Sequence, residues 1–367
     1  MGLSYLVYPG AHHTRFHHAL GSMHLMQKAV NVLRFKGIEI NEEEENALLI
    51  AILLHDIGHG PFSHAMEHSL VSDIMHEDIS LQFMEKLNLE FNGSLTLAIS
   101  IFKGEYKRKF MCQLISSQLD MDRADYLKRD SFYTGVAEGN VNSERLITML
   151  NVVDDKLVVE EKGIYSIEKF LIARRFMYWQ VYLHKTGLVA EQLLTRTLKR
   201  AKELVKSGER LKCSEALFYF LINEIDNTNF DDKTLEIFSK LDDIDILSAM
   251  KDWQYHNDFV LSNLCDMIIN RDLLKIKFKD KPINQKELSE HLTFLMDKYN
   301  ITEKEASYFV FTGSITNQAY NNKKDNINVL YKSGKIKDVT KVANQLNLKA
   351  LSKPITQYYI CYSKRKM

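Results

Sequence analysis

Histidines are concentrated near the N-terminus of this 367-residue chain. Ten of the thirteen histidines lie between positions 12 and 76, interleaved with glycines and carboxylates. They are His12, His13, His17, His18, His24, His55, His59, His64, His68 and His76. Imidazole is the commonest metal ligand and the usual proton shuttle near neutral pH. This density therefore indicates a metal site, a proton-transfer site, or both.

The most specific motif is HDIGHGPFSH, which spans His55 to His64 and follows the apolar run Ala47–Leu54. Adjacent residues on a helix point about 100° apart. His55 and Asp56 can therefore hold one ion together only where the helix ends and the backbone can adjust. Gly58 and Gly60 supply that freedom and let the backbone approach a bulky ligand closely. The motif predicts an imidazole and a carboxylate at the edge of the core.

Two further segments complete a coordination set. Arg15-Phe16-His17-His18 begins a helix upstream, and Asp120-Met121-Asp122-Arg123-Ala124-Asp125-Tyr126 lies in another helix downstream. The order His, His-Asp, Asp resembles the HD superfamily of phosphohydrolases, and in particular its deoxynucleoside triphosphate triphosphohydrolase branch. The matching stretches are Tyr8–Gly21, His55–His68, Met75–Glu77, Leu119–Gly135 and Arg175–Lys185. Weaker similarity continues to about residue 271.

The resemblance implies one divalent metal ion per subunit, bound by His18, His55, Asp56 and Asp122. The family pattern R-F-x-H selects His18 and not its neighbour His17. Two imidazoles and two carboxylates form a mixed nitrogen and oxygen set that suits Mn, Fe, Zn, Co, Ni or Mg, with positions left for water and a phosphate oxygen.

The resemblance also implies catalytic groups, foremost His59 and His76 and then His64 and Glu67. An imidazole beside a triphosphate can protonate the leaving oxygen, and a carboxylate can hold that imidazole in the useful tautomer. Human-type relatives carry Asp where this chain has Glu67. The remaining members of the cluster, His12, His13, His24 and His68, receive no catalytic role and are expected to be structural.

Substrate contacts follow from the same resemblance. Arg15, Arg123 and Lys185 are expected at the phosphates, Tyr126 and Asp130 at the sugar and its 3′-hydroxyl, and Tyr182 against the deoxyribose. A tyrosine packed under C2′ leaves no room for a ribose hydroxyl, which favours dNTPs over NTPs. Tyr178 and Trp179 are expected in the core. The implied reaction is attack of a metal-activated water on the α-phosphorus, giving a deoxynucleoside and tripolyphosphate.

The start of the chain departs from the family pattern. Relatives carry a helical segment ending in Gln-Leu-Gly before the Tyr-x-Val-x-Pro-Gly stretch, and its glutamine and leucine line the sugar pocket. Here Met1 falls at the leucine position. We expect either a start upstream of this one or a pocket without one wall.

Composition restricts the partners. Lys plus Arg equals Asp plus Glu at 48 each, so nucleic acid is an unlikely partner class. The four cysteines lack pairing or metal spacing, and no segment has the length of a membrane span or the pattern of a signal peptide. We therefore expect a cytoplasmic, soluble protein. The resemblance adds a homo-oligomer, as dimer or tetramer, and a possible nucleotide activator.

The elements that must position these residues are mostly helical. The predicted fold is mainly α, an HD-domain helical bundle with a small β-hairpin and a small α+β C-terminal appendage. Helices are expected over residues 15–36, 42–54, 63–71, 76–87, 114–128 and 169–206, and a hairpin over 156–168 turning near 162–163. Residues 1–150 are assigned to the metal-binding catalytic core, 151–275 to a helical continuation that completes the nucleotide pocket, and 276–367 to an appendage with oligomer or regulatory contacts.

Two other functions fit parts of this pattern. One is an HD phosphohydrolase that acts on another nucleotide, such as a monophosphate, a cyclic dinucleotide or an alarmone. The D-x-D-R-x-D-Y-L and Y-x-H-K stretches disfavour it, because such enzymes need only the metal ligands. The other is a nucleotide-binding regulator with weak catalysis. The complete ligand set disfavours simple loss of activity.

Overall fold

The computed structural model describes residues 1–62, 69–321, 326–342 and 353–363. Over these residues the chain is mainly helical with small sheets, which confirms the predicted fold class. The first part contains η1 (Gly2–Leu6), α1 (Arg15–Phe35), α2 (Glu42–Leu54), α4 (His76–Glu90), α5 (Thr96–Phe102), α6 (Lys109–Ile115), α7 (Met121–Thr134), η2 (Ala137–Gly139), α8 (Ser143–Thr148), η3 (Glu161–Gly163) and α9 (Ile164–Met177). The second part contains η4 (Tyr178–Tyr182), α10 (Lys185–Lys206), α11 (Glu215–Ile222), α12 (Asp232–Phe238), α13 (Asp243–Trp253), α14 (Phe259–Ile269), α15 (Gln285–Tyr299), α16 (Glu303–Ala306) and η5 (Val339–Lys341).

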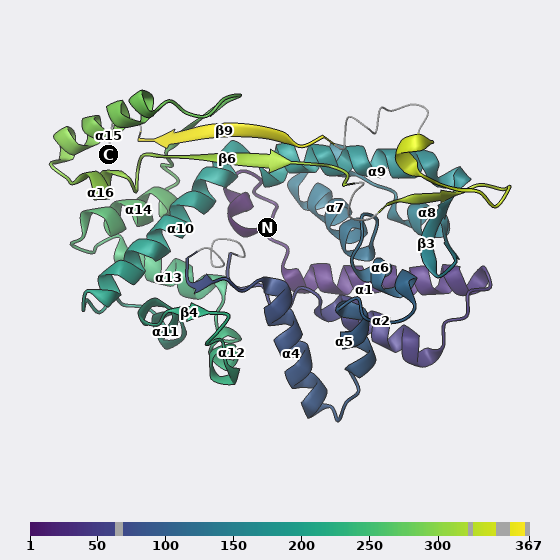
Figure 1. Ribbon diagram of the computed structural model, residues 1–367. Helices are drawn as coiled ribbons and strands as arrows, with labels where there is room; N and C mark the ends of the chain where they lie inside the picture. The colour runs from purple at the N-terminus through teal and green to yellow at the C-terminus, as the bar shows by residue number, and fades with distance from the viewer. Residues whose placement is uncertain (63–68, 322–325, 343–352, 364–367) are drawn as a thin grey trace.

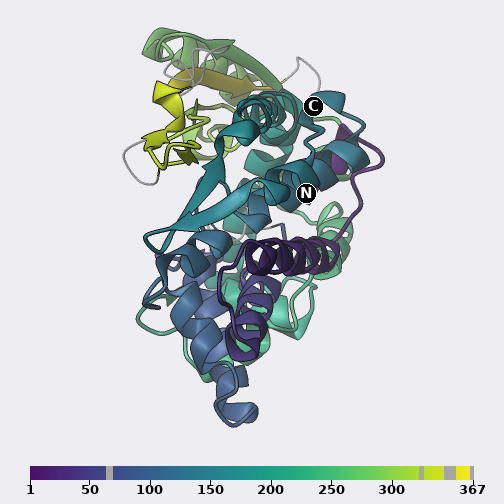
Figure 2. The ribbon, with the colours of Figure 1, turned by 90° about the vertical axis from the view of Figure 1, so that its right-hand side faces the viewer.

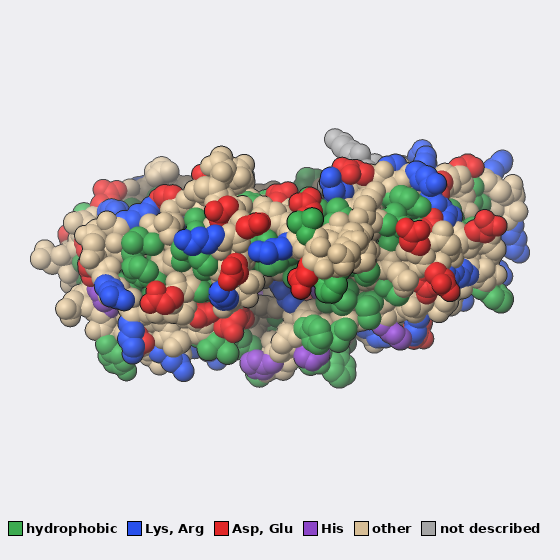
Figure 3. All heavy atoms as spheres, turned by 90° about the horizontal axis from the view of Figure 1, so that it is seen from below, with side chains coloured by type: hydrophobic (Ala, Val, Ile, Leu, Met, Phe, Trp, Pro, Cys, Tyr) green, Lys and Arg blue, Asp and Glu red, His purple; other side chains and the backbone are tan. Residues whose placement is uncertain are grey.

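The described residues form two hydrophobic cores. One lies among α1, α2 and α5–α9 and includes the fully buried Phe110 and Phe170. The other lies among α10–α14 and the strands near the C-terminus and includes Trp253 and Phe220. Figure 1 shows the two helical groups on the right and left of the molecule, with strands β6 and β9 running along the top. On the face seen in Figure 3, basic and acidic side chains are interspersed, in keeping with the balanced composition.

Strands join the C-terminal region to both groups. One sheet has the order β2-β3-β7-β8 and another has the order β5-β9-β6. The strands are β2 (Leu150–Val153), β3 (Lys156–Glu160), β5 (Lys275–Lys279), β6 (Phe311–Asn317), β7 (Asn328–Leu330), β8 (Ile336–Asp338) and β9 (Ile355–Tyr362), while β1 (Val71–Ser72) pairs in parallel with β4 (Ile225–Asp226). The strands predicted after residue 307 are therefore present. The division into three domains stays a prediction.

Side-chain caps fix the helices that carry the site. Thr14 accepts a hydrogen bond from His17 N at the start of α1, and Asn41 accepts one from Glu44 N at the start of α2. Asp120 does the same for Arg123 N at the start of α7. Such caps satisfy backbone donors that the first helical turn leaves unpaired. α1 packs against both α2 and α7, and its crossing with α2 is visible in Figure 2.

The predicted hairpin was placed wrongly. The turn is at Asp154 and Asp155, which both have positive φ, and it joins β2 to β3. Lys162 and Gly163 instead belong to the short helix η3. A two-residue loop with positive φ at both positions matches the right-handed twist of paired strands. Aspartate tolerates that conformation better than most residues, so no glycine was needed.

Three predicted helices also differ from the structure. α7 begins at Met121, because Asp120 caps a new helix after the break that follows α6. The helix predicted over 169–206 is divided by a π-helical turn, Tyr178–Tyr182, before α10 starts. Of the helix predicted over 63–71, residues 63–68 lie outside the described residues; residues 69–70 form a turn, and Val71 belongs to strand β1. The helices predicted at 15–36, 42–54 and 76–87 are confirmed within a few residues.

Candidate metal centre and active site

Four side chains from three helices converge at the centre of the molecule. They are His18 of α1, His55 and Asp56 at the end of α2, and Asp122 in the first turn of α7. His18 Nε2 lies 3.1 Å from Asp122 Oδ1 and 3.9 Å from Asp56 Oδ2. His55 Nε2 lies 3.5 Å from Asp56 Oδ1 and 3.5 Å from Asp122 Oδ1. The four predicted metal ligands therefore face one another.

The chemistry of this cluster fits a cation. His55 Nε2 is buried and has no hydrogen-bond partner among the described residues, although two carboxylates are near it. Burial alone would lower the pKa of His18, but its hydrogen bonds to Asp122 and Asp125 and the nearby carboxylate charges raise that pKa to about 10. The paired histidines hold the pKa of Asp122 below its ordinary value despite burial. The carboxylates thus favour positive charge here, and a bound divalent metal would replace the proton on His18.

A buried ion pair orients His18 from behind. His18 Nδ1 lies 2.8 Å from Asp125 Oδ2, and Arg129 donates two hydrogen bonds of 2.8 Å to the same carboxylate. A Cβ at Gly21 would lie 2.0 Å from the Arg129 guanidinium and 2.1 Å from Asp125 Oδ1, so only glycine leaves room for this pair. With Nδ1–H donated to Asp125, Nε2 of His18 is left as the ligand atom.

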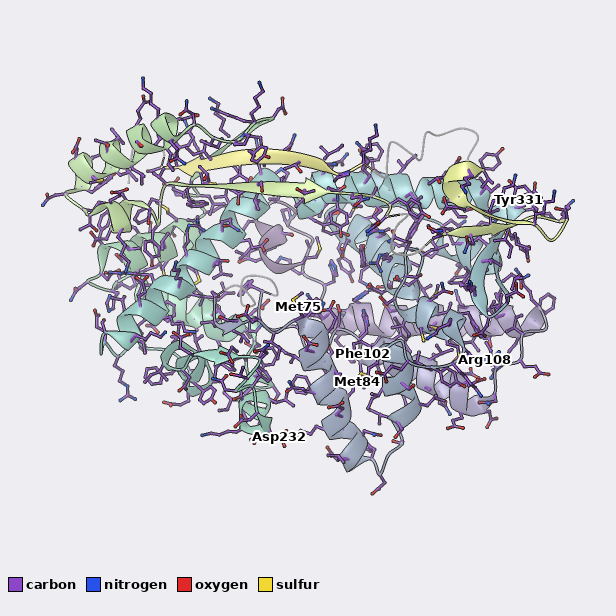
Figure 4. All side chains as sticks on the ribbon, viewed as in Figure 1. Met75, Met84, Phe102, Arg108, Asp232 and Tyr331 are labelled. Atoms are coloured by element: carbon purple, nitrogen blue, oxygen red, sulfur yellow. The ribbon has the colours of Figure 1, made fainter. Side chains whose placement is uncertain are left out.

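His59 and His76 lie directly beside the cluster. Their rings stack with centroids 3.7 Å apart, and His59 Nε2 lies 3.5 Å from Asp56 Oδ1. Ser80 fixes the arrangement by accepting from Gly58 N and donating to His55 O, at 2.9 Å each. A Cβ at Gly58 would lie 2.3 Å from the backbone oxygen of His76, which explains the glycine in the motif. In Figure 4, Met75 marks the N-terminal end of α4, immediately before His76, near the middle of the molecule.

Two arginines bring positive charge to the same place. Arg15 donates to Asp56 Oδ2 at 2.6 Å, and Arg123 pairs with the fully buried Asp120. Desolvation raises the pKa of Asp120, while the adjacent Arg123 opposes that shift. Both predicted phosphate-binding arginines line the central cavity.

A cavity of about 840 Å³ contains the whole constellation. On one wall Asp130 accepts a 2.7 Å hydrogen bond from the Tyr182 hydroxyl, and the ring of Tyr126 meets that of Tyr182 edge to face at 6.0 Å. Burial, followed by the charge of Asp130, raises the pKa of Tyr182 well above its ordinary value. The wall is therefore an aromatic surface next to a fixed carboxylate.

The sequence-predicted site residues divide into three groups. The four metal ligands, His59, His76, Arg15, Arg123, Tyr126, Asp130 and Tyr182 line one cavity. Lys185, at the first turn of α10, is not among the residues that line it. His64 and Glu67 lie outside the described residues. Their assignments, like those of the other site residues, remain predictions.

Sequence reasoning missed several residues of the site. Tyr178 was expected in the core but lines the cavity, whereas Trp179 packs on a core as predicted. His13 was expected to be structural, yet it lines the cavity and lies 2.7 Å from Asp130. Asp125 could have been found, because it follows Asp122 by one helical turn. Residues 1–4 line the cavity too.

Comparison with known proteins identifies the class. The HD domain profile matches residues 15–130, and the profile of the HD associated region matches residues 141–215. The chain belongs to the HD domain family. A crystal structure of a phosphohydrolase from Bacteroides thetaiotaomicron superposes with a TM-score of 0.96 at 52% identity, covering 99% of this chain and 91% of that one.

Two relatives in sequence extend this result. YwfO of Bacillus subtilis is 34% identical over 93% of this chain and 79% of its own length. The deoxynucleoside triphosphate triphosphohydrolase SAMHD1 homolog of Dictyostelium discoideum is 30% identical over 58% of this chain and 45% of its own length. The chain thus spans less than half of that relative. The predicted resemblance to the deoxynucleoside triphosphate triphosphohydrolase branch is confirmed at the level of homology. Within the described residues, no helix combines the length and the apolar character needed to cross a membrane.

Proposed function

We propose that this protein is a metal-dependent phosphohydrolase that cleaves dNTPs to deoxynucleoside and tripolyphosphate. One observation carries the proposal: the four metal ligands, two arginines and the Tyr126–Asp130–Tyr182 wall share a single cavity. Its volume of about 840 Å³ lies within the range for small-molecule sites. The relationship to SAMHD1 triphosphohydrolases supports the choice of a dNTP among nucleotides.

The protein's own side chains would act on different parts of the substrate. Arg15 and Arg123 bind phosphate oxygens and offset the charge that develops during in-line displacement. His59 or His76 gives a proton to the departing 5′-oxygen. Tyr182 packs under C2′ and excludes a ribose hydroxyl. A divalent cation held by the four ligands would supply Lewis acidity and an activated water at neutral pH.

Product analysis tests the proposal. Purified protein with Mn²⁺ and an equimolar mixture of the four dNTPs is followed by phosphorus NMR and by chromatography of nucleosides. We expect tripolyphosphate and deoxynucleosides from the wild type and from the control His24→Ala, whose side chain is exposed on α1, but not from Asp122→Ala. Pyrophosphate or orthophosphate in place of tripolyphosphate would show cleavage at another bond of the dNTP and would contradict the proposed reaction. Full activity of metal-loaded Asp122→Ala would refute the site assignment.

Several finer expectations stay predictions. They are the identity of the metal, the homo-oligomeric state, a nucleotide activator and the cytoplasmic location. A nucleotide-binding regulator is the competing function, and binding of dNTPs without any product from folded, metal-loaded protein would support it.

A further inference from the structure

His13 lies in a position that sequence reasoning did not explain. It precedes α1, far along the chain from α7, yet its side chain is only 4% exposed and it lines the central cavity. A close approach of the backbone brings it there. A Cβ at Gly10 would lie 2.6 Å from the carbonyl oxygen of Tyr133, so glycine lets the segment before α1 lie against the end of α7.

The His13 ring contacts two residues of one face of α7. It stacks on Tyr133 with centroids 4.4 Å apart and planes 23° from parallel. Its Nε2 atom lies 2.7 Å from Asp130 Oδ1. Asp130 and Tyr133 are three residues apart and share a helical face, so one imidazole can meet both. The stack fixes the plane of the ring, and this holds Nε2 at hydrogen-bond distance from the carboxylate.

The proton of His13 can be placed from its surroundings. Nδ1 is buried and has no hydrogen-bond partner among the described residues, so a hydrogen there would be an unpaired buried donor. The hydrogen of neutral His13 therefore belongs on Nε2, where it is donated to Asp130. The Tyr182 hydroxyl donates to the other oxygen, Oδ2, at 2.7 Å. Asp130 is thus held from both sides, by one donor on each oxygen.

We infer that His13 is a positioning residue that, together with Tyr182, fixes the Asp130 carboxylate to accept a hydrogen bond from the 3′-hydroxyl of the substrate sugar. A carboxylate oxygen has lone pairs for more than one donor, so a donor already present does not block a second one. A fixed acceptor loses less orientational freedom on binding than a mobile one, and it favours substrates that carry the matching donor. This inference rests on the proposed function, because it assigns the sugar hydroxyl of a dNTP to Asp130.

The test is a cycle of two enzymes and two substrates. Wild type and His13→Ala are each assayed with a dNTP and with the 2′,3′-dideoxy analogue of the same base. A hydrogen bond to a charged group implies that the wild type prefers the 3′-hydroxyl by roughly ten- to a hundredfold in kcat/KM. In His13→Ala we expect that preference to fall at least threefold, because kcat/KM should fall more for the dNTP than for the analogue. His13→Gln, which keeps an N–H donor, should recover part of the preference, and His24→Ala should behave as wild type.

The outcomes separate the inference from the proposed function. Equal losses on both substrates in His13→Ala, with the preference intact, would show a merely structural role and overturn the inference. If the wild type makes no product, the proposed function fails. The same comparison is then made with the affinities of both proteins for the two nucleotides, measured by calorimetry. Binding that favours the 3′-hydroxyl in the wild type but not in His13→Ala would still support the role of His13. Binding indifferent to that hydroxyl in the wild type would overturn it.

Discussion

Replacing Asp125 with Asn removes the charge that orients His18 while leaving the shape of the side chain. In the structure Asp125 Oδ2 lies 2.8 Å from His18 Nδ1, and its side chain is 8% exposed. A hydrogen bond to a charged acceptor contributes about 1.5–3 kcal/mol and one between neutral groups about 0.5–1.5 kcal/mol. The difference of about 1–1.5 kcal/mol corresponds to roughly five- to twelvefold in affinity.

We therefore expect Asp125→Asn to bind Mn²⁺ about tenfold more weakly than the wild type, in line with the range for second-layer partners of metal ligands. Gly21→Ala should produce a similar loss by a different route, because its added Cβ displaces the same Asp125–Arg129 pair. The assay is calorimetric titration of metal-free protein, which needs no substrate. Lys128→Ala, at an exposed position of α7, serves as the control. Unchanged affinity in both Asp125→Asn and Gly21→Ala would refute the reasoning that this pair orients the ligand.

Three further predictions follow from named contacts. Mn²⁺ at a hundred times its Kd should stabilise the wild type by about 2.7 kcal/mol, which corresponds to a rise of roughly 3–4 °C in Tm. The same Mn²⁺ concentration should not stabilise Asp122→Ala. An equal rise in Tm of both proteins would place the metal elsewhere. Glu44, buried beside Arg108 (labelled in Figure 4), accepts hydrogen bonds from Arg108 and Tyr106 that outweigh burial and lower its pKa. Its stabilising effect is therefore present above the ordinary glutamate pKa and is lost as pH falls through the lower folded value. Glu44→Gln should lower the free energy of unfolding by about 2 kcal/mol at pH 7 and by less below pH 4.5. Chemical denaturation measures this difference between wild type and variant, and a difference that is constant with pH would contradict the prediction. Tyr182→Ala should raise hydrolysis of NTPs relative to dNTPs by tenfold or more, and an unchanged ratio in competition assays would remove Tyr182 from sugar selection.

The convergence of the four predicted metal ligands could be expected from the sequence, because local structure sets their spacing. Gly58 is required by the contact with His76, and Asp120 caps the helix that carries Asp122. Such signals lie within a few residues of the groups they position. The caps at Thr14 and Asn41 are predictable for the same reason.

The missed features depend on partners far away in the chain or on competing local signals. His13 meets Asp130 across 117 residues, and no pattern around His13 reveals that contact. The hairpin was misplaced because Gly163 is the usual turn residue, whereas the actual turn uses Asp154 and Asp155. Tyr178, which was expected in the core, begins the π-helical turn and lies on the cavity wall, and no local signal in the sequence marks that break in the helix.

In the proposed reaction, water attacks the α-phosphorus of a dNTP. Hydrolysis in ¹⁸O-labelled water, followed by phosphorus NMR and mass spectrometry of both products, tests it directly. Attack at phosphorus predicts the label in tripolyphosphate and an unlabelled 5′-hydroxyl in the deoxynucleoside. A labelled deoxynucleoside, or a nucleoside monophosphate with pyrophosphate, would rule out this reaction.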